Sequence, residues 1–171
     1  GQSETEAGAN VLASLRGAFG RIVLEEGANL QDTCVMHGFP DSDTVVERHG
    51  HIGHGAVIHG CRIGADALIG MNAVVMDRAS IGARSFVSAS AFVKAGFVCE
   101  PQSLVIGAPA SVKRLLGDEE VAWKQAATRE YQLLAQRCRE GLVECQPLST
   151  PEPGRQPVWS SALRPRVDQR G

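Results

Sequence analysis

Aliphatic residues recur about every six positions through the larger part of the chain. They are Leu24, Leu30, Met36, Ile52, Ile58, Ile63, Ile69, Val75, Ile81, Val87 and Val93. A small residue lies two positions before many of them, at Ala28, Cys34, Ala56, Cys61, Ala67, Ala73, Ala79, Ser85 and Ala91. Antiparallel strands would instead alternate with a period of two and carry longer turn signals. The six-residue period predicts the hexapeptide repeats of a parallel β-helix, in which three hexads make one triangular coil.

This pattern assigns a place to each kind of residue. The aliphatic side chain fills the axis of the coil, and the small side chain fits near a corner. The period breaks between residues 39 and 50, and we expect this segment to bulge out of the coil. The segment from Gly8 to Leu15 has the pattern of a hexad entered part-way.

The C-terminal part follows a different pattern. The hexads end near Pro101, and a helix is predicted from about residue 119 to about residue 143, with Asp118 as its N-cap. One apolar face of this helix is formed by Ala127, Tyr131, Leu134, Cys138, Leu142 and Cys145. We expect that face to pack on the flank of the β-helix or on a neighbour. The predicted parts are an all-β β-helix over residues 1–110, a C-terminal α-helix within 111–145 and a Pro-rich extended tail over 146–171.

Composition narrows the class of protein. The net charge of -2 gives no basic field that would attract nucleic acid or an anionic membrane, and no apolar span is long enough for a transmembrane helix. Five cysteines occur without a CxxC pair, which predicts reduced thiols used as small core residues in a cytosolic protein. Residues 1–10 lack the charged and apolar regions of a signal peptide. We therefore expect a cytoplasmic protein that binds neither nucleic acid nor membrane.

All five histidines lie between residues 37 and 59, and two of them share a position in the repeat. His37 follows Met36, and His59 follows Ile58. The two histidines are 22 residues apart. One coil takes about 18 residues, and the bulge is expected to absorb the difference. They should therefore stack on adjacent coils, about 4.8 Å apart at the backbone, where one metal ion can bind both.

His54 belongs to the preceding hexad and to a different corner of the triangle. It should not meet His37 and His59 inside one protomer, because one side of the triangle is up to about 20 Å long. A threefold association of protomers would bring the three imidazoles together at each interface. Such a set with an open fourth position is a catalytic Zn²⁺ arrangement that lowers the pKa of bound water to about 7, and Fe²⁺ or Co²⁺ is also compatible. The alternative is loop histidines that bind no metal, and His49 and His51 are expected to be exposed or to support the ligands from behind.

Three segments carry a resemblance to a known family. They read GANLQDTCVMHG at 27–38, GHIGHGAVIHGC at 50–61 and IGMNAVVMD at 69–77. Over nearly all of residues 8–145 the chain resembles the γ-class carbonic anhydrase-like proteins. The resemblance implies a left-handed β-helix and a homotrimer with interfacial metal sites, in which His37 and His59 come from one subunit and His54 from the next. Further segments, among them SASAFVKA at 88–95, are closest to members that act in phenylacetate degradation.

Four other positions match the family one at a time. Gln31 and Asp32 match a Gln-Asp pair before the first ligand. Gln31 is implied to be a catalytic residue that hydrogen-bonds metal-bound water or hydroxide, and Asp32 to be structural, pairing with an arginine at the interface. Arg16 matches the arginine of the family's Arg-Gly-Asp segment, beside the site and the trimer contact. Tyr131 resembles a helix tyrosine that faces the metal, and an ordinary core tyrosine is the alternative.

The chain also departs from the family pattern. The Arg-Gly-Asp segment ends in Ala18, so the usual contact between arginine and aspartate is missing. Phe19 and Pro40 stand where the proton-shuttling glutamates of the best carbonic anhydrases are expected, which handicaps rapid proton export. The hexads that precede the arginine in the family are largely absent, so we expect an N-terminally incomplete β-helix.

The histidine pattern predicts a metal site, and the resemblance implies a metal-dependent hydrolase of phenylacetate catabolism. The resemblance implies a thioesterase that acts on coenzyme A thioesters of ring-hydroxylated or ring-opened intermediates. A metal-bound hydroxide would attack the thioester carbonyl, and the metal would polarise its oxygen. The sequence shows no evident Ser–His–Asp arrangement or covalent nucleophile. The alternatives are a γ-type carbonic anhydrase that hydrates CO₂, a coenzyme A-dependent acyltransferase with a histidine base, and a non-catalytic scaffold.

Overall fold

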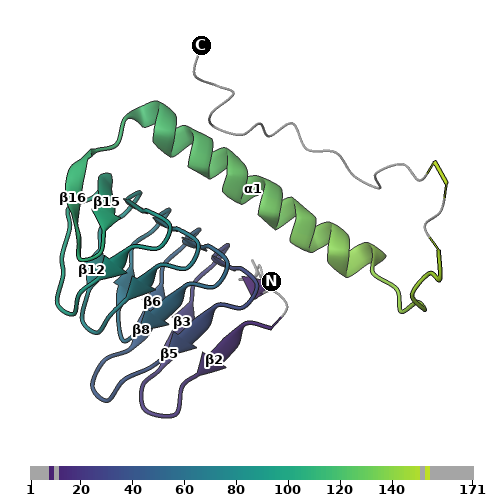
Figure 1. The fold of residues 1–171 in the computed structure, drawn as a ribbon, viewed down its shortest axis with the longest axis horizontal. Helices are drawn as coiled ribbons and strands as arrows, with labels where there is room; N and C mark the ends of the chain where they lie inside the picture. The colour runs from purple at the N-terminus through teal and green to yellow at the C-terminus, as the bar shows by residue number, and fades with distance from the viewer. Residues whose placement is uncertain (1–7, 10–11, 151–152, 155–171) are drawn as a thin grey trace, which may run out of the picture.

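The chain winds into a left-handed parallel β-helix, and one long helix lies along its side (Figure 1). In this computed structural model, the described residues are 8–9, 12–150 and 153–154. Successive strands from β1 to β14 pass in turn through three sheets, here called face A, face B and face C. Within the described residues, the last coil has no strand on face C, where Val98 forms only an isolated bridge with Ser80. The fold predicted from the hexads is therefore confirmed.

Face A is the widest of the three sheets. Its order is β1 (Gly8–Ala9), β4 (Asn29–Leu30), β7 (His51–Ile52), β10 (Leu68–Ile69), β13 (Phe86–Val87), β15 (Ser103–Gly107) and β16 (Ala110–Leu115). Face B comprises β14 (Phe92–Val93), β11 (Val74–Val75), β8 (Val57–His59), β5 (Val35–His37) and β2 (Ser14–Arg16). Face C comprises β12 (Ser80–Ile81), β9 (Arg62–Ile63), β6 (Thr44–Val46) and β3 (Ile22–Leu24). The strands pair in parallel, except that β16 turns back antiparallel to β15 at the end of the sheet.

The axis and the corners are filled as the repeat predicts. The aliphatic series from Leu30 to Val93 is at most 1% exposed, and the small residues before it are at most 2% exposed. Leu24, near the N-terminal end, is only partly buried against this core. Glycine follows several axial residues because the next coil passes too close for a side chain. A Cβ on Gly64 would lie 2.6 Å from the backbone nitrogen of Ala83.

The break in the period is shorter than predicted. Thr44 begins β6, and Val46 is a fully buried axial residue six positions before Ile52. The bulge is therefore confined to residues 38–43. Within it, Phe39 and Ser42 form an antiparallel bridge, and the Ser42 hydroxyl donates a 2.6 Å hydrogen bond to the carbonyl of the following coil at residue 60. The repeat pattern did not predict this return to register, because β6 lacks a small residue two positions before its axial valine.

The C-terminal helix, α1, spans Asp118–Gly141. Asp118 is its first residue rather than its N-cap, because the extended residue Gly117 caps the helix and donates its N–H to the Glu120 carboxylate at 2.9 Å. The predicted apolar face is wrong at its C-terminal end, since Leu142 lies beyond the helix and is 78% exposed. Cys145 is also exposed. No helix in the described part of the chain is long and apolar enough to cross a membrane.

Packing of α1 uses polar residues as well as apolar ones. The helix residues that become buried are Val121, Lys124 and Thr128. The Lys124 ammonium donates a 2.6 Å hydrogen bond to the carbonyl of His49 and lies 3.6 Å from Asp66. Burial lowers the pKa of Lys124 to about 8, against the opposing influence of Asp66. The flank of the β-helix therefore holds α1 partly through backbone and carboxylate acceptors.

The cysteines are in the state that the sequence predicts, whereas the tail is described only in part. All five cysteines are free, and Cys34, Cys61 and Cys99 are buried as predicted for small core residues. Burial raises the pKa of the Cys61 thiol to about 12, so this thiol is protonated at neutral pH. Residues 142–150 contain no helix or strand, and most of the predicted tail lies outside the described residues.

Candidate metal centre

Three outward-facing residues of face B align across adjacent coils. Arg16 of β2, His37 of β5 and His59 of β8 are direct partners in the parallel register. Each histidine follows an axial residue that points inward, and side chains alternate along a strand, so both imidazoles point away from the core. The arrangement confirms that the two histidines occupy the same position on neighbouring coils.

The imidazoles of His37 and His59 stack with their nitrogen atoms facing each other. The ring centroids are 4.8 Å apart with 24° between the planes, and His37 Nδ1 lies 2.9 Å from His59 Nε2. Two nitrogen ligands of a tetrahedral zinc ion, at about 2.0–2.1 Å from the metal, lie about 3.3 Å from each other. A small outward movement of either ring would therefore suit a shared ion.

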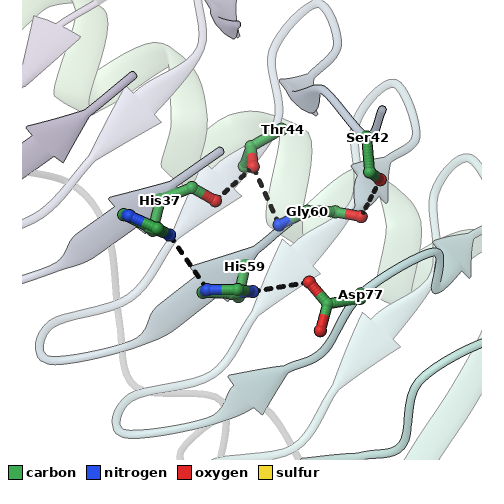
Figure 2. Close-up of polar contacts among 6 residues, drawn as sticks. All are labelled: His37, Ser42, Thr44, His59, Gly60 and Asp77. Atoms are coloured by element: carbon green, nitrogen blue, oxygen red, sulfur yellow. Dashed lines mark hydrogen bonds and ion pairs between the residues drawn. The ribbon is translucent and has the colours of Figure 1, made fainter. Parts of the chain in front are cut away.

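The other nitrogen of His59 is held by a carboxylate. His59 Nδ1 lies 2.6 Å from Asp77 Oδ1, and both side chains are about three-quarters buried (Figure 2). Donation of the Nδ1 proton to Asp77 leaves Nε2 as the free electron pair, on the side that faces His37. Metal-binding histidines commonly donate their second N–H in this way. Asp77 was not among the predicted site residues, although it lies 18 residues after His59, which is one coil further along.

The backbone around the histidine pair is fixed by hydroxyl groups of the bulge and of β6. The Thr44 hydroxyl donates to the carbonyl of His37 at 2.7 Å and accepts the N–H of Gly60 at 2.9 Å (Figure 2). Thr44 is fully buried, so its two hydrogen bonds tie the ends of β5 and β8 together without competition from water. The separation of the two imidazoles is therefore built into the coil.

His54 lies at the corner between face A and face B. Its Nδ1 is 3.0 Å from Asp32 Oδ2, and its side chain is 47% exposed. The buried side chain of Gln31 accepts the backbone N–H of His54 at 3.1 Å, which fixes this corner. The contact of Asp32 with His54 was not predicted, and the expected pairing of Asp32 with an arginine across an interface stays a prediction.

The described part of one chain places only two of the predicted metal ligands, His37 and His59, close together. Among the described residues, no group of three His, Cys, Asp or Glu side chains is placed to hold a metal ion. The donor set nevertheless fits a metal that is shared between chains. His37 and His59 converge on one point, and His54 presents a carboxylate-supported imidazole at an exposed corner. The roles of these three histidines as ligands remain predictions.

Of the two expectations for His49 and His51, exposure is wrong for His51, and support of the ligands stays a prediction. His51 is buried beneath α1, with its ring 5.0 Å from the ring of Tyr131 in an edge-to-face arrangement of 78°. Burial, with Lys124 and His54 nearby, lowers the pKa of His51 to about 4. His49 is half-buried, and its Nδ1 lies 3.0 Å from Gln132 Nε2. Both histidines therefore help to dock the helix.

Aromatic rings flank the histidine pair. The Phe19 ring lies 6.1 Å from the His37 ring, and the Phe39 ring lies 5.7 Å from the His59 ring. Phe39, rather than the neighbouring Pro40, is thus the residue beside the second histidine. Neither ring can carry a proton, which agrees with the missing shuttle residues noted in the sequence.

A groove of about 400 Å³ lies between α1 and face A and includes His54 in its lining. Its β-helix side includes Gln31, His51 and His54, and its helix side includes Trp123 and Tyr131. The predicted site residues Gln31 and Tyr131 therefore line one cavity with His54. Arg16 lies elsewhere, exposed in the His37 column on face B.

Repeating hexads, three parallel faces and a flanking helix define a hexapeptide-repeat protein. The bacterial transferase hexapeptide family, characterised by six repeats, matches residues 60–95. Carnitine operon protein CaiE of Salmonella agona is 57% identical over 144 residues, which cover 84% of this chain and 73% of that protein. The Citrobacter koseri CaiE is 61% identical over 144 residues, which again cover 84% of this chain and 73% of that protein. The chain therefore belongs to the CaiE family of hexapeptide-repeat proteins.

A solved structure supports the same assignment. The crystal structure of a hexapeptide transferase family protein from Anaplasma phagocytophilum matches with a TM-score of 0.73 and 32% sequence identity. The match covers 80% of this chain and 78% of that protein. The fold and the family are thus established together, and the reaction is a separate question.

Proposed function

We propose that this protein is a metal-dependent thioesterase that hydrolyses coenzyme A thioesters. The observation that carries the proposal is the convergence of His37 and His59, with His59 oriented by Asp77. The carboxylate-supported His54 supplies the third imidazole from a neighbouring chain. Zn²⁺ is the expected ion, and Fe²⁺ or Co²⁺ also suits three nitrogen ligands.

The neighbouring chain is inferred to be a copy of the same protein in a homotrimer. Face B presents a column of apolar side chains in register, formed by Val35, Val57, Val74 and Phe92. This column lies beside the histidine column, and Phe92 is 40% exposed. Burial of such a surface favours association. Threefold symmetry would repeat the same contact three times and build three identical sites.

Each site residue has a distinct task in this proposal. A bound metal would supply a hydroxide nucleophile at neutral pH and would polarise the thioester carbonyl. Asp77 and Asp32 hold the tautomers of His59 and His54. Gln31, fixed by its bond to the backbone of His54, orients the substrate or attacking water from the groove.

The acyl group is the part of the substrate on which the two lines of resemblance differ. Segments of the sequence resemble the phenylacetic acid degradation protein PaaY, which favours thioesters from phenylacetate catabolism. The curated relatives described above are named for a carnitine operon. We propose the phenylacetate-type thioester rather than a carnitine-type one. The groove between α1 and face A, which includes His54, offers a way to distinguish the two acyl groups.

An acyltransferase is the second candidate. The matching family and the Anaplasma phagocytophilum structure are both named as transferases. The His59–Asp77 pair would then act as a general base that deprotonates an acceptor. Carbon dioxide hydration is a weaker candidate, because Phe19 and Phe39 stand beside the histidines where a proton carrier is needed.

Metal analysis combined with a thioester assay separates these candidates. The purified protein should contain about one metal ion per chain, and phenylacetyl-coenzyme A hydrolysis should stop on chelation and return with Zn²⁺ or Co²⁺. Hydrolysis by a metal-free protein would refute the metal-dependent reaction. Activity that requires an acyl acceptor would identify a transferase, and activity on CO₂ alone would identify a carbonic anhydrase.

A further inference from the structure

The groove between α1 and face A begins at a candidate metal ligand and continues along the β-helix. His54, Met71 and Ala89 line it from three successive coils on the corner between faces A and B. Ala127 and Trp123 line it from the helix. A thioester whose carbonyl lies beside His54 has room to extend its acyl group into this groove.

The groove offers an apolar environment with aromatic walls. Leu68 and Met71 contribute aliphatic surface, and Trp123 and Tyr131 contribute rings. Its volume of about 400 Å³ falls within the range of about 300–1,000 Å³ that is usual for small-molecule pockets. Such a lining favours an apolar acyl group, because moving apolar surface out of water into the groove is favourable.

The charges around the groove disfavour a cationic occupant. Among the described residues that line it, none is an aspartate or a glutamate, whereas Lys124 does line it. Two carboxylates lie near the groove without lining it: Asp66 is 3.6 Å from the Lys124 ammonium, and Asp32 is held 3.0 Å from His54 Nδ1. His51 on the floor is neutral at pH 7, since burial lowers its pKa to about 4. A quaternary ammonium group would gain some attraction from the aromatic rings, but it would lose its hydration without a carboxylate partner.

We propose that this groove receives the acyl group of the substrate and selects an uncharged apolar group over a quaternary ammonium group. The inference rests on the proposed thioester substrate. It identifies the groove as the feature that distinguishes a phenylacetate-type acyl group from a carnitine-type one. Met71 and Ala127 are the residues that set this specificity.

Two hydrolysis-resistant thioethers of coenzyme A test the selection directly. The 3,3-dimethylbutyl and 2-(trimethylammonio)ethyl thioethers have nearly the same shape and differ in a carbon or a charged nitrogen atom. Calorimetry with the full-length protein should show that the neutral thioether binds about tenfold more tightly or better. Equal or tighter binding of the cationic thioether, or no binding of either, would overturn the inference.

Paired variants locate the binding in the groove. Ala127→Phe fills the cavity from the helix side and should weaken the neutral thioether by about tenfold or more. Ala126→Phe makes the same change at an exposed neighbour that does not line the groove, and it should leave binding within about twofold. Equal effects of the two variants would place the acyl group elsewhere.

A charge added at the groove provides an independent test that does not depend on filling the cavity. Met71 is 53% exposed, so Met71→Asp should fold, and it should tighten the cationic thioether relative to the neutral one. Asn72→Asp adds the same charge at the next residue, outside the groove lining, and should not change the preference. A protein that binds the neutral thioether as described but hydrolyses no thioester would retain this inference and refute the proposed function.

Discussion

At the scale of single residues, Asp77 determines which nitrogen of His59 is available. The 2.6 Å contact with Nδ1 leaves Nε2 facing His37, the orientation that a shared metal ion requires. Asp77→Asn would remove the charge but keep the size, and the amide could present its N–H₂ to His59 and favour the wrong tautomer. Chelator competition should show metal affinity reduced by about 10–100-fold. Asp41→Asn, at an exposed residue of the bulge, is the matched control.

If Asp77→Asn and Asp41→Asn bind metal equally well, the carboxylate does not support a ligand and His59 has another role. The measurement does not require the reaction to be known, so it tests the site separately from the proposed activity.

His51 should make folding sensitive to acid. The folded pKa of about 4 lies below the ordinary value of 6.5, so between these pH values the unfolded chain binds more protons and stability rises with pH. The stabilisation is complete above about pH 6.5 and is lost as pH falls towards 4, and the full difference is about 3 kcal/mol. Urea unfolding of metal-free protein at fixed concentration should show a smaller loss for His51→Asn than for the parent.

The control for this measurement is His49→Asn, at a half-buried histidine on the same side of α1. It should retain the acid dependence of the parent protein. An unchanged acid dependence in His51→Asn would show that other groups cause it.

Several residues of the candidate site follow from the repeat, and others do not. The stacking of His37 and His59 could be predicted because both follow an axial residue, and Asp77 could have been found by counting one more coil. The contact between His54 and Asp32 arises from two corner turns, whose side-chain directions the six-residue period does not specify. The burial of His51 depends on where α1 packs. Neither the six-residue period of the coils nor the apolar spacing of the helix specifies that position.

At the scale of elements, the coil depends on glycine where successive turns nearly touch. Gly64→Ala places a Cβ 2.6 Å from the backbone nitrogen of Ala83, and two backbones must shift to relieve it. Urea unfolding should show a loss of about 1–3 kcal/mol. Gly141→Ala adds the same atom at the end of α1, where nothing lies within 4 Å, and should cause no loss. Equal stability of the two variants would contradict the close-packed corner.

The helix could be predicted in position but not in its buried face. The apolar spacing that includes Leu134 and Cys138 suggested a purely hydrophobic contact, yet Lys124 and Thr128 are among the buried residues. The acceptors for Lys124 are the carbonyl of His49 and the carboxylate of Asp66, which lie on adjacent coils far from Lys124 in the sequence. Helical spacing shows which positions are apolar. It does not show that a buried lysine will find a carbonyl or carboxylate acceptor on the β-helix.

At the scale of the whole molecule, the described residues of one chain bring together only two of the three proposed ligands. Two converging imidazoles lie on face B, and the third lies on the corner between faces A and B with a solvent-exposed side chain. The apolar column beside the histidine pair offers the surface on which a second copy would pack. Oligomerisation and metal binding are therefore expected to be coupled, and each should stabilise the other.

The most direct test of this account is a subunit-mixing experiment. His54→Ala and His59→Ala each remove one ligand from every site, so each variant alone should bind little metal. When the two variants are co-expressed, about one quarter of the interfaces in random trimers would join an intact His37–His59 pair to an intact His54. The mixed protein should therefore recover metal and thioesterase activity at about that fraction of the parent level. No recovery in mixed trimers of normal stability would contradict a site shared between subunits.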